Sequence, residues 1–334
     1  MALLDIFNGD AFGVVSLTAS INKLPQRPSK LGDMGLFTVK SIATASATVE
    51  EMDGKLSLIQ SAPRGTRTRE MAHAKRKIRA FPVPHLPAYE SVKADEILGI
   101  REFGTESSDG MQTIAKLVND RLQMMKNSID VTKEWHRAAA IRGLLLDANG
   151  DVMFDFFQEF GVTPESFPFD FSATPTEDVK VTCQKISRAL IFALGDQPYT
   201  GIQAICGDNF WDAFISCASV KEAYKNYDNT FLKQQQRNGF TFGDIFWMNY
   251  TAKVGGVDLI ETDKCRFIPM GAGETLQEIY APADFIETVN TAGQPYYAKQ
   301  MVLPYDKGIE MHAQSNPLIM CNRPGCLMEG TIAP

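Results

Sequence analysis

The sequence lacks the short motifs that mark common catalytic and cofactor sites. It contains no glycine-rich phosphate loop, no dinucleotide-binding fingerprint, no metalloprotease helix and no serine on a nucleophile elbow. The 4 histidines are His73, His85, His136 and His312, and none lies beside a serine or cysteine in a catalytic pattern. A site assembled from residues far apart in the sequence stays open. These absences favour a protein that has no catalytic residues and binds no cofactor.

A basic leader and long apolar runs are also absent. The first lysine is Lys23, and the apolar segment from Ala11 to Ile21 is too short to span a bilayer. The formal net charge of -7 argues against a dedicated nucleic-acid-binding surface. Hydrophobic residues make up 44% of the 334 residues, which is enough for a folded core. We therefore expect a soluble, cytosolic protein without membrane contact, long enough for two domains.

The 6 cysteines follow neither a disulfide framework nor a strong metal-binding pattern. They are scattered among apolar residues, as buried thiols are. Cys321, Cys326 and His312 could supply three zinc ligands, but the spacing is loose and no fourth ligand is evident. The segment 147–151 resembles the start of a calcium loop, but its glycine stands at the fourth position instead of the sixth. The sequence thus predicts no metal site.

A long amphipathic helix is predicted over residues 109–142. Asp109 can cap its first free amides, and Gly143 marks its end. At ~1.5 Å per residue the helix would be roughly 50 Å long. Apolar residues recur at the helical period: Met111, Ile114, Val118, Leu122, Met125 and Ile129. The charged residues of the other face are expected to be solvated or to face another subunit: Lys116, Asp120, Arg121, Lys126, Asp130, Lys133, Glu134 and Arg137.

The segments before this helix are predicted to be mostly extended. Residues 1–35 indicate an arm with one short helical piece at most. Strand-forming residues at 36–49, a turn at Asp53-Gly54 and a strand at 55–60 predict a β-hairpin. A short helix is expected near 91–98.

Helices and strands are mixed after the long helix, which is an α+β pattern. We predict a hairpin that turns at 147–151 and an aromatic loop at 156–175. Helices are expected at 176–194 and 210–227, and strands at 202–206, 240–250, 257–261, 296–303, 309–314 and 318–321.

Two blocks of opposite charge stand out. Residues 64–79 carry seven basic side chains against Glu70, a net charge of +6, whereas residues 147–179 carry eight acidic side chains and no lysine or arginine. The basic block could be a solvated loop, and it lacks the aromatic residues of a nucleic-acid patch. The alternative is a contact between subunits. The candidate interface residues are Arg64, Arg67, Arg69, Arg76, Lys77, Arg79, Asp151, Asp155 and Glu159.

Several stretches, taken in order, resemble a known family. They are Leu31–Phe37, Val49–Ile59, Ile141–Gly150, Cys206–Trp211, Val220–Tyr224 and Met311–Ile319. Their order, together with the arm, hairpin and long helix, resembles the major capsid proteins of tailed phages, and most closely the lambda-type major capsid protein E family.

The resemblance implies the Hong Kong 97-type phage capsid fold. The expected parts are an N-arm at 1–35, an extended β-hairpin E-loop at 36–95 and an A-domain at 176–285. A P-domain would comprise 96–175 and 286–334, with the spine helix at 109–142. The implied function is that of a major capsid protein, which self-assembles as hexamers and pentamers into an icosahedral shell.

The implied partners are other components of a phage head. The spine helix is expected too early in the chain to leave room for an N-terminal scaffolding extension, so a separate scaffolding protein is expected. A portal protein, a decoration protein as a further candidate, and enclosed double-stranded DNA without sequence-specific binding complete the set. The location would be the virion, assembled in the host cytoplasm. The alternatives are an encapsulin-like nanocompartment shell, or a soluble α/β enzyme with Cys206 or Cys321 as nucleophile.

Overall fold

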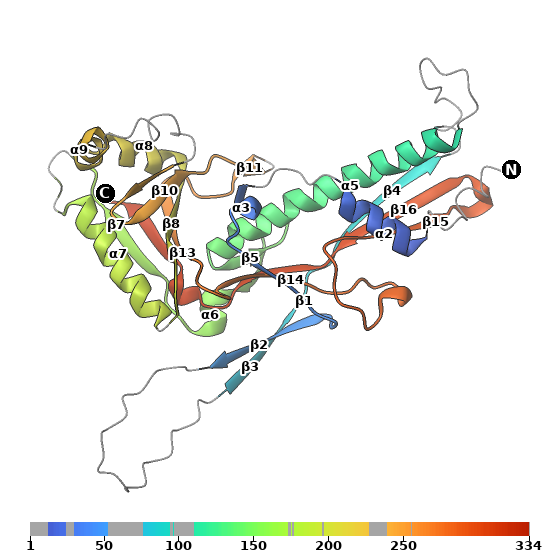
Figure 1. Ribbon diagram of the computed structural model, residues 1–334, viewed down its shortest axis with the longest axis horizontal. Coiled ribbons are helices and arrows are strands. Elements are labelled where there is room, and N and C mark those ends of the chain that lie inside the picture. Colours follow the sequence, from blue (N-terminus) through green and yellow to red (C-terminus); the bar gives the residue numbers. More distant parts are fainter. Residues whose placement is uncertain are drawn as a thin grey trace, which may run out of the picture. The chain divides into compact units, whose positions relative to one another are not determined.

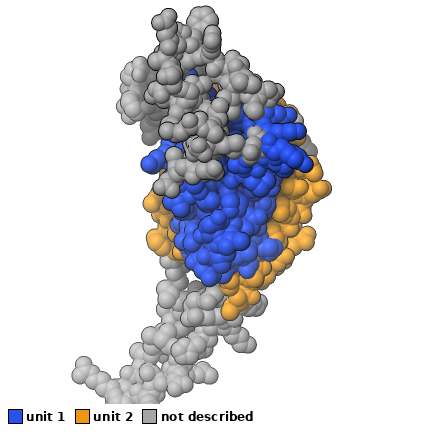
Figure 2. Space-filling model, turned by 90° about the vertical axis from the view of Figure 1, so that its right-hand side faces the viewer, with its two compact units in different colours: residues 1–47, 82–137, 277–319 blue, residues 48–81, 138–276, 320–334 orange. Residues whose placement is uncertain are grey.

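The computed structural model describes residues 13–24, 30–52, 76–93, 96, 110–172, 175, 177–195, 197–226, 239–254 and 256–333. The chain divides into two compact units, coloured separately in Figure 2. Unit 1 comprises residues 1–47, 82–137 and 277–319, and unit 2 comprises residues 48–81, 138–276 and 320–334. Each unit therefore joins segments that lie far apart in the sequence, and both contain helices and strands.

The long helix α5 runs from Gly110 to Ile141, so the predicted helix is confirmed within one residue at each end. Val118, Leu122, Met125 and Ile129 of its predicted apolar stripe are buried. The side chains of Met111 and Ile114 lie outside the described residues. Gly143 ends the helix with a φ of +77°, and a Cβ there would lie 2.2 Å from a ring carbon of Phe157. The turn therefore requires glycine.

In unit 1, α5 packs on a three-stranded antiparallel sheet in the order β15-β16-β4 (Figure 1). The strands are β4 (Leu86–Lys93), β15 (Tyr297–Val302) and β16 (Gly308–Ser315). Helix α2 (Val14–Lys23) packs against β15, and Leu17 and Ile21 join the same core. The apolar stripe of α5 therefore faces strands from the beginning and the end of the chain.

A second sheet has the order β1-β14-β17. Its strands are β1 (Thr38–Ser41), β14 (Leu276–Tyr280) and β17 (Pro317–Cys321). Unit 1 also contains the short helix α3 (Lys30–Asp33) and the 3-10 helices η2 (Ile286–Thr288) and η3 (Pro304–Asp306).

Unit 2 is built around a mixed six-stranded sheet, β7-β18-β13-β8-β10-β9. Trp247 lies at the centre of its core among phenylalanines of the sheet and of α8. The strands are β7 (Glu165–Phe169), β8 (Gly201–Cys206), β9 (Phe240–Phe242), β10 (Ile245–Asn249), β13 (Lys264–Met270) and β18 (Met328–Ile332). The helices that pack on this core are α7 (Val179–Leu194), α8 (Asp208–Ser216) and α9 (Ala218–Asn226).

Smaller elements complete the described chain. They are the strand pairs β2 (Ser46–Met52) with β3 (Arg76–Pro82), β5 (Leu144–Leu146) with β6 (Val152–Asp155) and β11 (Lys253–Val254) with β12 (Val257–Asp258), the helix α6 (Phe156–Phe160) and the 3-10 helix η4 (Pro324–Cys326). Across the described ranges, no helix is long and apolar enough to cross a membrane.

The hairpin before α5 differs from its prediction. Strand β2 pairs with β3, and the expected partner at 55–60 and turn at Asp53-Gly54 lie outside the described residues. The expected single strand at 36–49 is instead two strands, β1 and β2, because β1 pairs in parallel with β14. The short helix expected near 91–98 is wrong at its start, since residues 91–93 belong to β4 and pair with β16. Long-range pairing overrides local propensity in all three places.

Other boundaries were also wrong. The expected aromatic loop contains α6 and β7, and the expected helix at 210–227 is broken at Cys217, which has an extended ψ of 139°. The expected strand at 257–261 is only the two-residue β12, and the one at 240–250 is a hairpin of β9 and β10. The described residues of the arm contain two helical pieces, α2 and α3, whereas one at most was expected. Strands β13, β14 and β18 are absent from the prediction.

Candidate functional site

The charged face of α5 is buried inside unit 1 over its second half. Lys126, Asp130, Lys133, Glu134 and Arg137 are all buried, whereas Lys116 and Asp120 are exposed. The prediction that this whole face is solvated or faces another subunit is therefore wrong for these five residues. We call them, together with Glu278 of β14, the α5 ion cluster.

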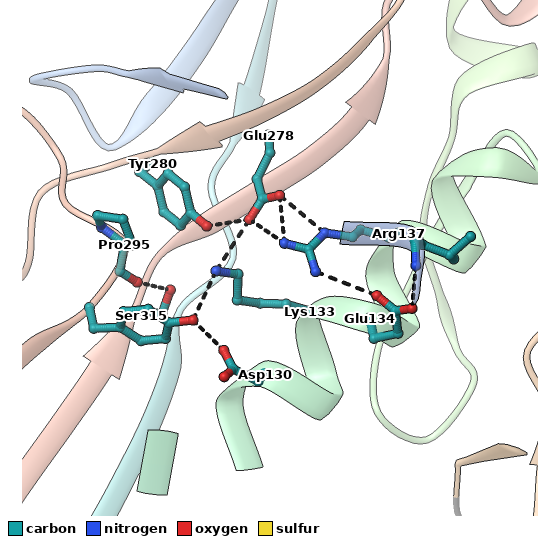
Figure 3. Close-up of polar contacts among 10 residues, drawn as sticks. Asp130, Lys133, Glu134, Arg137, Glu278, Tyr280, Pro295 and Ser315 are labelled. Carbon is teal, nitrogen blue, oxygen red and sulfur yellow. Dashed lines mark hydrogen bonds and ion pairs between the residues drawn. The ribbon is translucent and has the colours of Figure 1, made fainter. Parts of the chain in front are cut away.

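Glu278 is the centre of the cluster (Figure 3). Its carboxylate accepts hydrogen bonds from Arg137 Nη2 at 2.8 Å and from Arg137 Nε at 3.1 Å. Lys133 Nζ lies 3.3 Å from Glu278 Oε1, and the hydroxyl of Tyr280 donates to the same oxygen. Arg137 also lies 3.4 Å from Glu134. One buried carboxylate is thus shared by two cations and a phenol.

The cluster also holds the first segments of the chain against α5. Lys126 Nζ donates to the carbonyl oxygens of Ile21 at 3.0 Å and Leu24 at 2.8 Å. Those carbonyls stand near the end of α2, where a cation is favoured by the helix dipole. The backbone N–H of Leu31 in α3 donates to Glu134 Oε1 at 2.9 Å. The cluster therefore joins α2, α3, α5 and β14 of unit 1.

The surroundings shift the pKa values of the cluster. Burial raises the pKa of the Glu278 carboxyl, but Lys133 and Arg137 outweigh it and hold that pKa below its usual range. Burial lowers the pKa of Lys133, and Glu278 only partly offsets this. The Lys133 ammonium also lies 4.8 Å from the ring centre of Tyr280 and 4.7 Å from that of Tyr296. Because the charged groups of the cluster bind one another, we interpret its role as holding helices and strands of unit 1 together.

The basic interface residues lie only partly within the described structure. Arg64, Arg67 and Arg69 lie outside it, and Arg76 and Lys77 belong to β3 with side chains outside it. The guanidinium of Arg79 stacks over the ring of Phe160, 4.9 Å from its centre. Phe81, at the same end of β3, packs against the rings of Phe154, Phe156 and Phe160. The end of β3 therefore packs on α6 of the same chain.

The acidic interface residues differ from one another. Asp151 and Glu159 are exposed, so they are available to a partner. Asp155 is the N-cap of α6, and its Oδ1 accepts from the backbone N–H groups of Phe157 at 2.9 Å and Gln158 at 3.2 Å. Asp155 therefore stabilises its own helix.

The candidate zinc ligands Cys321, Cys326 and His312 lie in packed surroundings. All six thiols are buried, and burial raises the pKa of Cys321 and that of Cys326, the latter to about 11. Such thiols are weak nucleophiles near neutral pH, which disfavours Cys321 as a catalytic group. His312 stacks on Tyr89 with ring centres 4.3 Å apart. Within the described ranges, no three His, Cys, Asp or Glu side chains are grouped to hold a metal ion.

Exposed apolar side chains form a feature that the sequence reasoning missed. Phe192 of α7 is 90% exposed, and Ile286 of η2 and Tyr305 of η3 are 89% and 91% exposed. Phe192 lies off the buried stripe of α7, which includes Cys183, Ile186 and Leu190, so the helical period could have revealed it. Large apolar side chains that stay exposed are suited to contacts with other molecules.

Comparison with known proteins gives a consistent result. A family model described as phage major capsid protein E matches residues 13–332. The major capsid protein of Pseudomonas phage KPP10 is 26% identical, covering 96% of this chain and 97% of its own length. That of Salmonella phage Felix O1 (isolate Felix O1-VT1) is 22% identical, covering 95% of each chain.

Solved structures agree at the level of the fold. The chain is similar, with a TM-score of 0.59 and 15% identity, to a protein assigned to the capsid of a prophage of E. coli CFT073, covering 96% of this chain and 99% of that one. The mature capsid of bacteriophage PhiM1 matches with a TM-score of 0.51 and 11% identity, over 93% of this chain and 89% of that one. The predicted α+β fold of phage capsid proteins is therefore confirmed.

Proposed function

Because the chain belongs to the phage major capsid protein E family, we propose that it is the major capsid protein of a tailed phage. Many copies would assemble as hexamers and pentamers into an icosahedral shell. The observation that carries this proposal is the family match over residues 13–332, in a chain with the capsid fold. The role is structural, and no catalytic residue is proposed.

The proposed division of the chain into N-arm, E-loop, P-domain and A-domain is refined by the strand pairing. Strands β1 and β4 pair with β14 and β16, which supports an E-loop made of the β2–β3 segment, 46–82. Strands β7 and β18 pair with the central sheet of unit 2, so we assign both to the A-domain. The spine helix of the P-domain is α5.

The fold of the chain supports assembly with other copies. A shell subunit must bury large surfaces against its neighbours. Phe192, Ile286 and Tyr305 provide apolar contacts, and Asp151 and Glu159 provide exposed charge. The proposed partners of the basic block at residues 64–79 are the acidic residues of a neighbouring copy.

Further proposed partners follow from the role in a phage head. They are a separate scaffolding protein, a portal protein, a decoration protein and packaged DNA. The net charge of -7 suits a shell that encloses DNA without binding it tightly. The proposed location is the virion, after assembly in the host cytoplasm.

Electron microscopy of the purified chain, alone and with a scaffolding protein, tests the proposal. We expect rings or closed shells that sediment far ahead of a monomer. The matched control is a Phe192→Gln, Ile286→Gln double variant, which should keep the circular dichroism of the parent and form fewer shells. A monodisperse monomer under all assembly conditions would contradict the proposal.

A further inference from the structure

Two cysteines lie side by side across neighbouring strands at the centre of unit 2. Cys206 ends β8, and Cys265 stands directly opposite it in the antiparallel strand β13. The two Sγ atoms are 3.3 Å apart, and both side chains are completely buried. Both are free thiols in this structure.

The strand register places this pair at a position that can accept a disulfide. The next pair is hydrogen-bonded, since the N–H of Gly207 donates to the carbonyl of Lys264 at 2.9 Å. Hydrogen-bonded and non-hydrogen-bonded pairs alternate in antiparallel strands, so Cys206 and Cys265 form a non-hydrogen-bonded pair. The Cα atoms of such a pair are about 4.5 Å apart, inside the disulfide range of roughly 4.4–6.8 Å.

Both side chains also point to the same face of the sheet. Residues alternate between faces along a strand, and Ala204 and Phe267, two positions from each cysteine, belong to the same core as the thiols. Closing the bond therefore requires the sulfurs to approach from 3.3 Å to about 2.05 Å, without turning either strand over.

We propose that Cys206 and Cys265 are a redox site, a dithiol under reducing conditions and a cross-strand disulfide under oxidising ones. The oxidant is a low-molecular-weight disulfide such as oxidised glutathione. The thiolate of one cysteine attacks it, forms a mixed disulfide and releases one glutathione thiolate. The second cysteine thiolate attacks the protein sulfur of that mixed disulfide and releases the second glutathione. Two protein thiols are oxidised, one glutathione disulfide is reduced, and both thiol protons pass to the released glutathiones.

The surroundings make the reaction slow in the folded chain. Burial, reinforced by the hydrogen bond and the charge of the neighbouring Cys206, raises the pKa of the Cys265 thiol. The attacking species is the thiolate, and the oxidant must reach a closed core, so a local opening of the sheet precedes exchange. The dithiol is therefore oxidised during long exposure to oxidised glutathione, whereas brief exposure leaves it reduced.

The bond would strengthen unit 2. It joins residues 59 apart in sequence and encloses the described elements from α8 to β12, so it restricts the unfolded chain strongly. A shell built from oxidised subunits would resist disruption better than a reduced one. That consequence rests on the proposed function, whereas formation of the bond does not.

The test uses the full-length chain in two arms. In the first arm, the native protein is incubated with oxidised glutathione. In the second arm, the protein is refolded from denaturant in the same buffer, so that burial of the thiols no longer limits their reaction with glutathione. Remaining thiols are alkylated, and peptides are mapped without reduction. We expect a Cys206–Cys265 linked peptide in both arms, appearing faster on refolding. The oxidised protein should show a Tm several degrees higher, and reductant should reverse the rise.

The controls separate the pair from the other thiols. Cys206→Ala and Cys265→Ala should each abolish the linked peptide and the rise in Tm. Cys321→Ala should leave both unchanged, because Cys321 lies in β17, which belongs to a different sheet from β8 and β13. The proposal is overturned if both cysteines are recovered alkylated after both arms, or if either one links to another cysteine instead. Assembly is not measured, so this result is independent of the proposed function.

Discussion

At the scale of single residues, Glu278 links several buried polar groups of unit 1. It is buried between Lys133 and Arg137, and both of those cations are themselves buried. Removing one member of such a group leaves a buried charge unpaired, which costs far more than losing a surface pair. The cluster is therefore stable only as a complete set.

Glu278→Gln should lower the free energy of unfolding by about 3–5 kcal/mol, because two buried cations lose their carboxylate. Urea unfolding followed by circular dichroism measures the change. The matched control is Glu287→Gln, which breaks the exposed pair with Lys299 and should have little effect. Equal effects of the two substitutions would show that the buried cluster contributes no more to the free energy of unfolding than an exposed ion pair does.

The lowered pKa of Glu278 predicts that acid reduces the free energy of unfolding. The folded pKa of Glu278 lies below its unfolded value, so its contribution is fully present above the unfolded pKa of about 4.3. It is lost as pH falls through the folded pKa, because the unfolded chain binds the proton more readily. The stability difference between wild type and Glu278→Gln should therefore shrink steadily below about pH 4. Parallel curves for the two proteins down to the acid transition would contradict this.

At the scale of elements, α5 carries two kinds of contact on its two faces. Leu122, Met125 and Ile129 pack on the sheet of unit 1, whereas Lys126 and Glu134 bind the segments of α2 and α3. The helix therefore determines where those short elements lie, although neither has a long apolar stripe of its own.

Leu122→Ala should destabilise the chain by about 2–5 kcal/mol, since it leaves a cavity against the sheet. Met124→Ala, on the exposed face of the same helix, should stay within about 0.5 kcal/mol of the wild type. Chemical denaturation of both variants gives the comparison. If the two variants unfold alike, the apolar stripe does not hold the helix in place.

At the scale of the whole molecule, the charge blocks are expected to set how copies meet. Each exposed pair contributes only ~0–1 kcal/mol, and salt screens it over a Debye length of about 8 Å. Repeated around every ring of subunits, such pairs would still control assembly and make it sensitive to salt. Arg79 and Asp155 are unsuitable for testing this, because they contact Phe160 and cap α6 within the chain.

Reversing Arg76 and Lys77 to glutamate should block shell formation while leaving the circular dichroism unchanged. Reversing Asp151 and Glu159 to lysine in the same chain should partly restore shells, as seen by electron microscopy. The control reverses Lys180 and Lys221, two exposed lysines of α7 and α9 in unit 2, and should assemble normally. Failure of the restoration, with both parent variants folded, would show that the two blocks do not meet.

The sequence alone determined the features that depend on neighbouring residues. The period of apolar residues and Gly143 located α5 within one residue at each end, and the helix predicted at 176–194 is α7, with Asp178 as its N-cap. The turn at 147–151 and the strand at 202–206 were also identified locally. The order of such stretches was enough to indicate the capsid family, which the comparisons confirmed.

Only the tertiary structure decided which charged side chains are buried and which strands pair with distant segments. Lys133 and Arg137 look like surface residues in sequence, because their partner Glu278 is 141 residues away from Arg137. The same holds for Arg266 of β13 and for Gln277 and Glu278 of β14, which are polar residues buried in strands that pair with distant segments. A buried charge or polar strand is stable only when its partner is supplied, and that partner is a property of the folded chain.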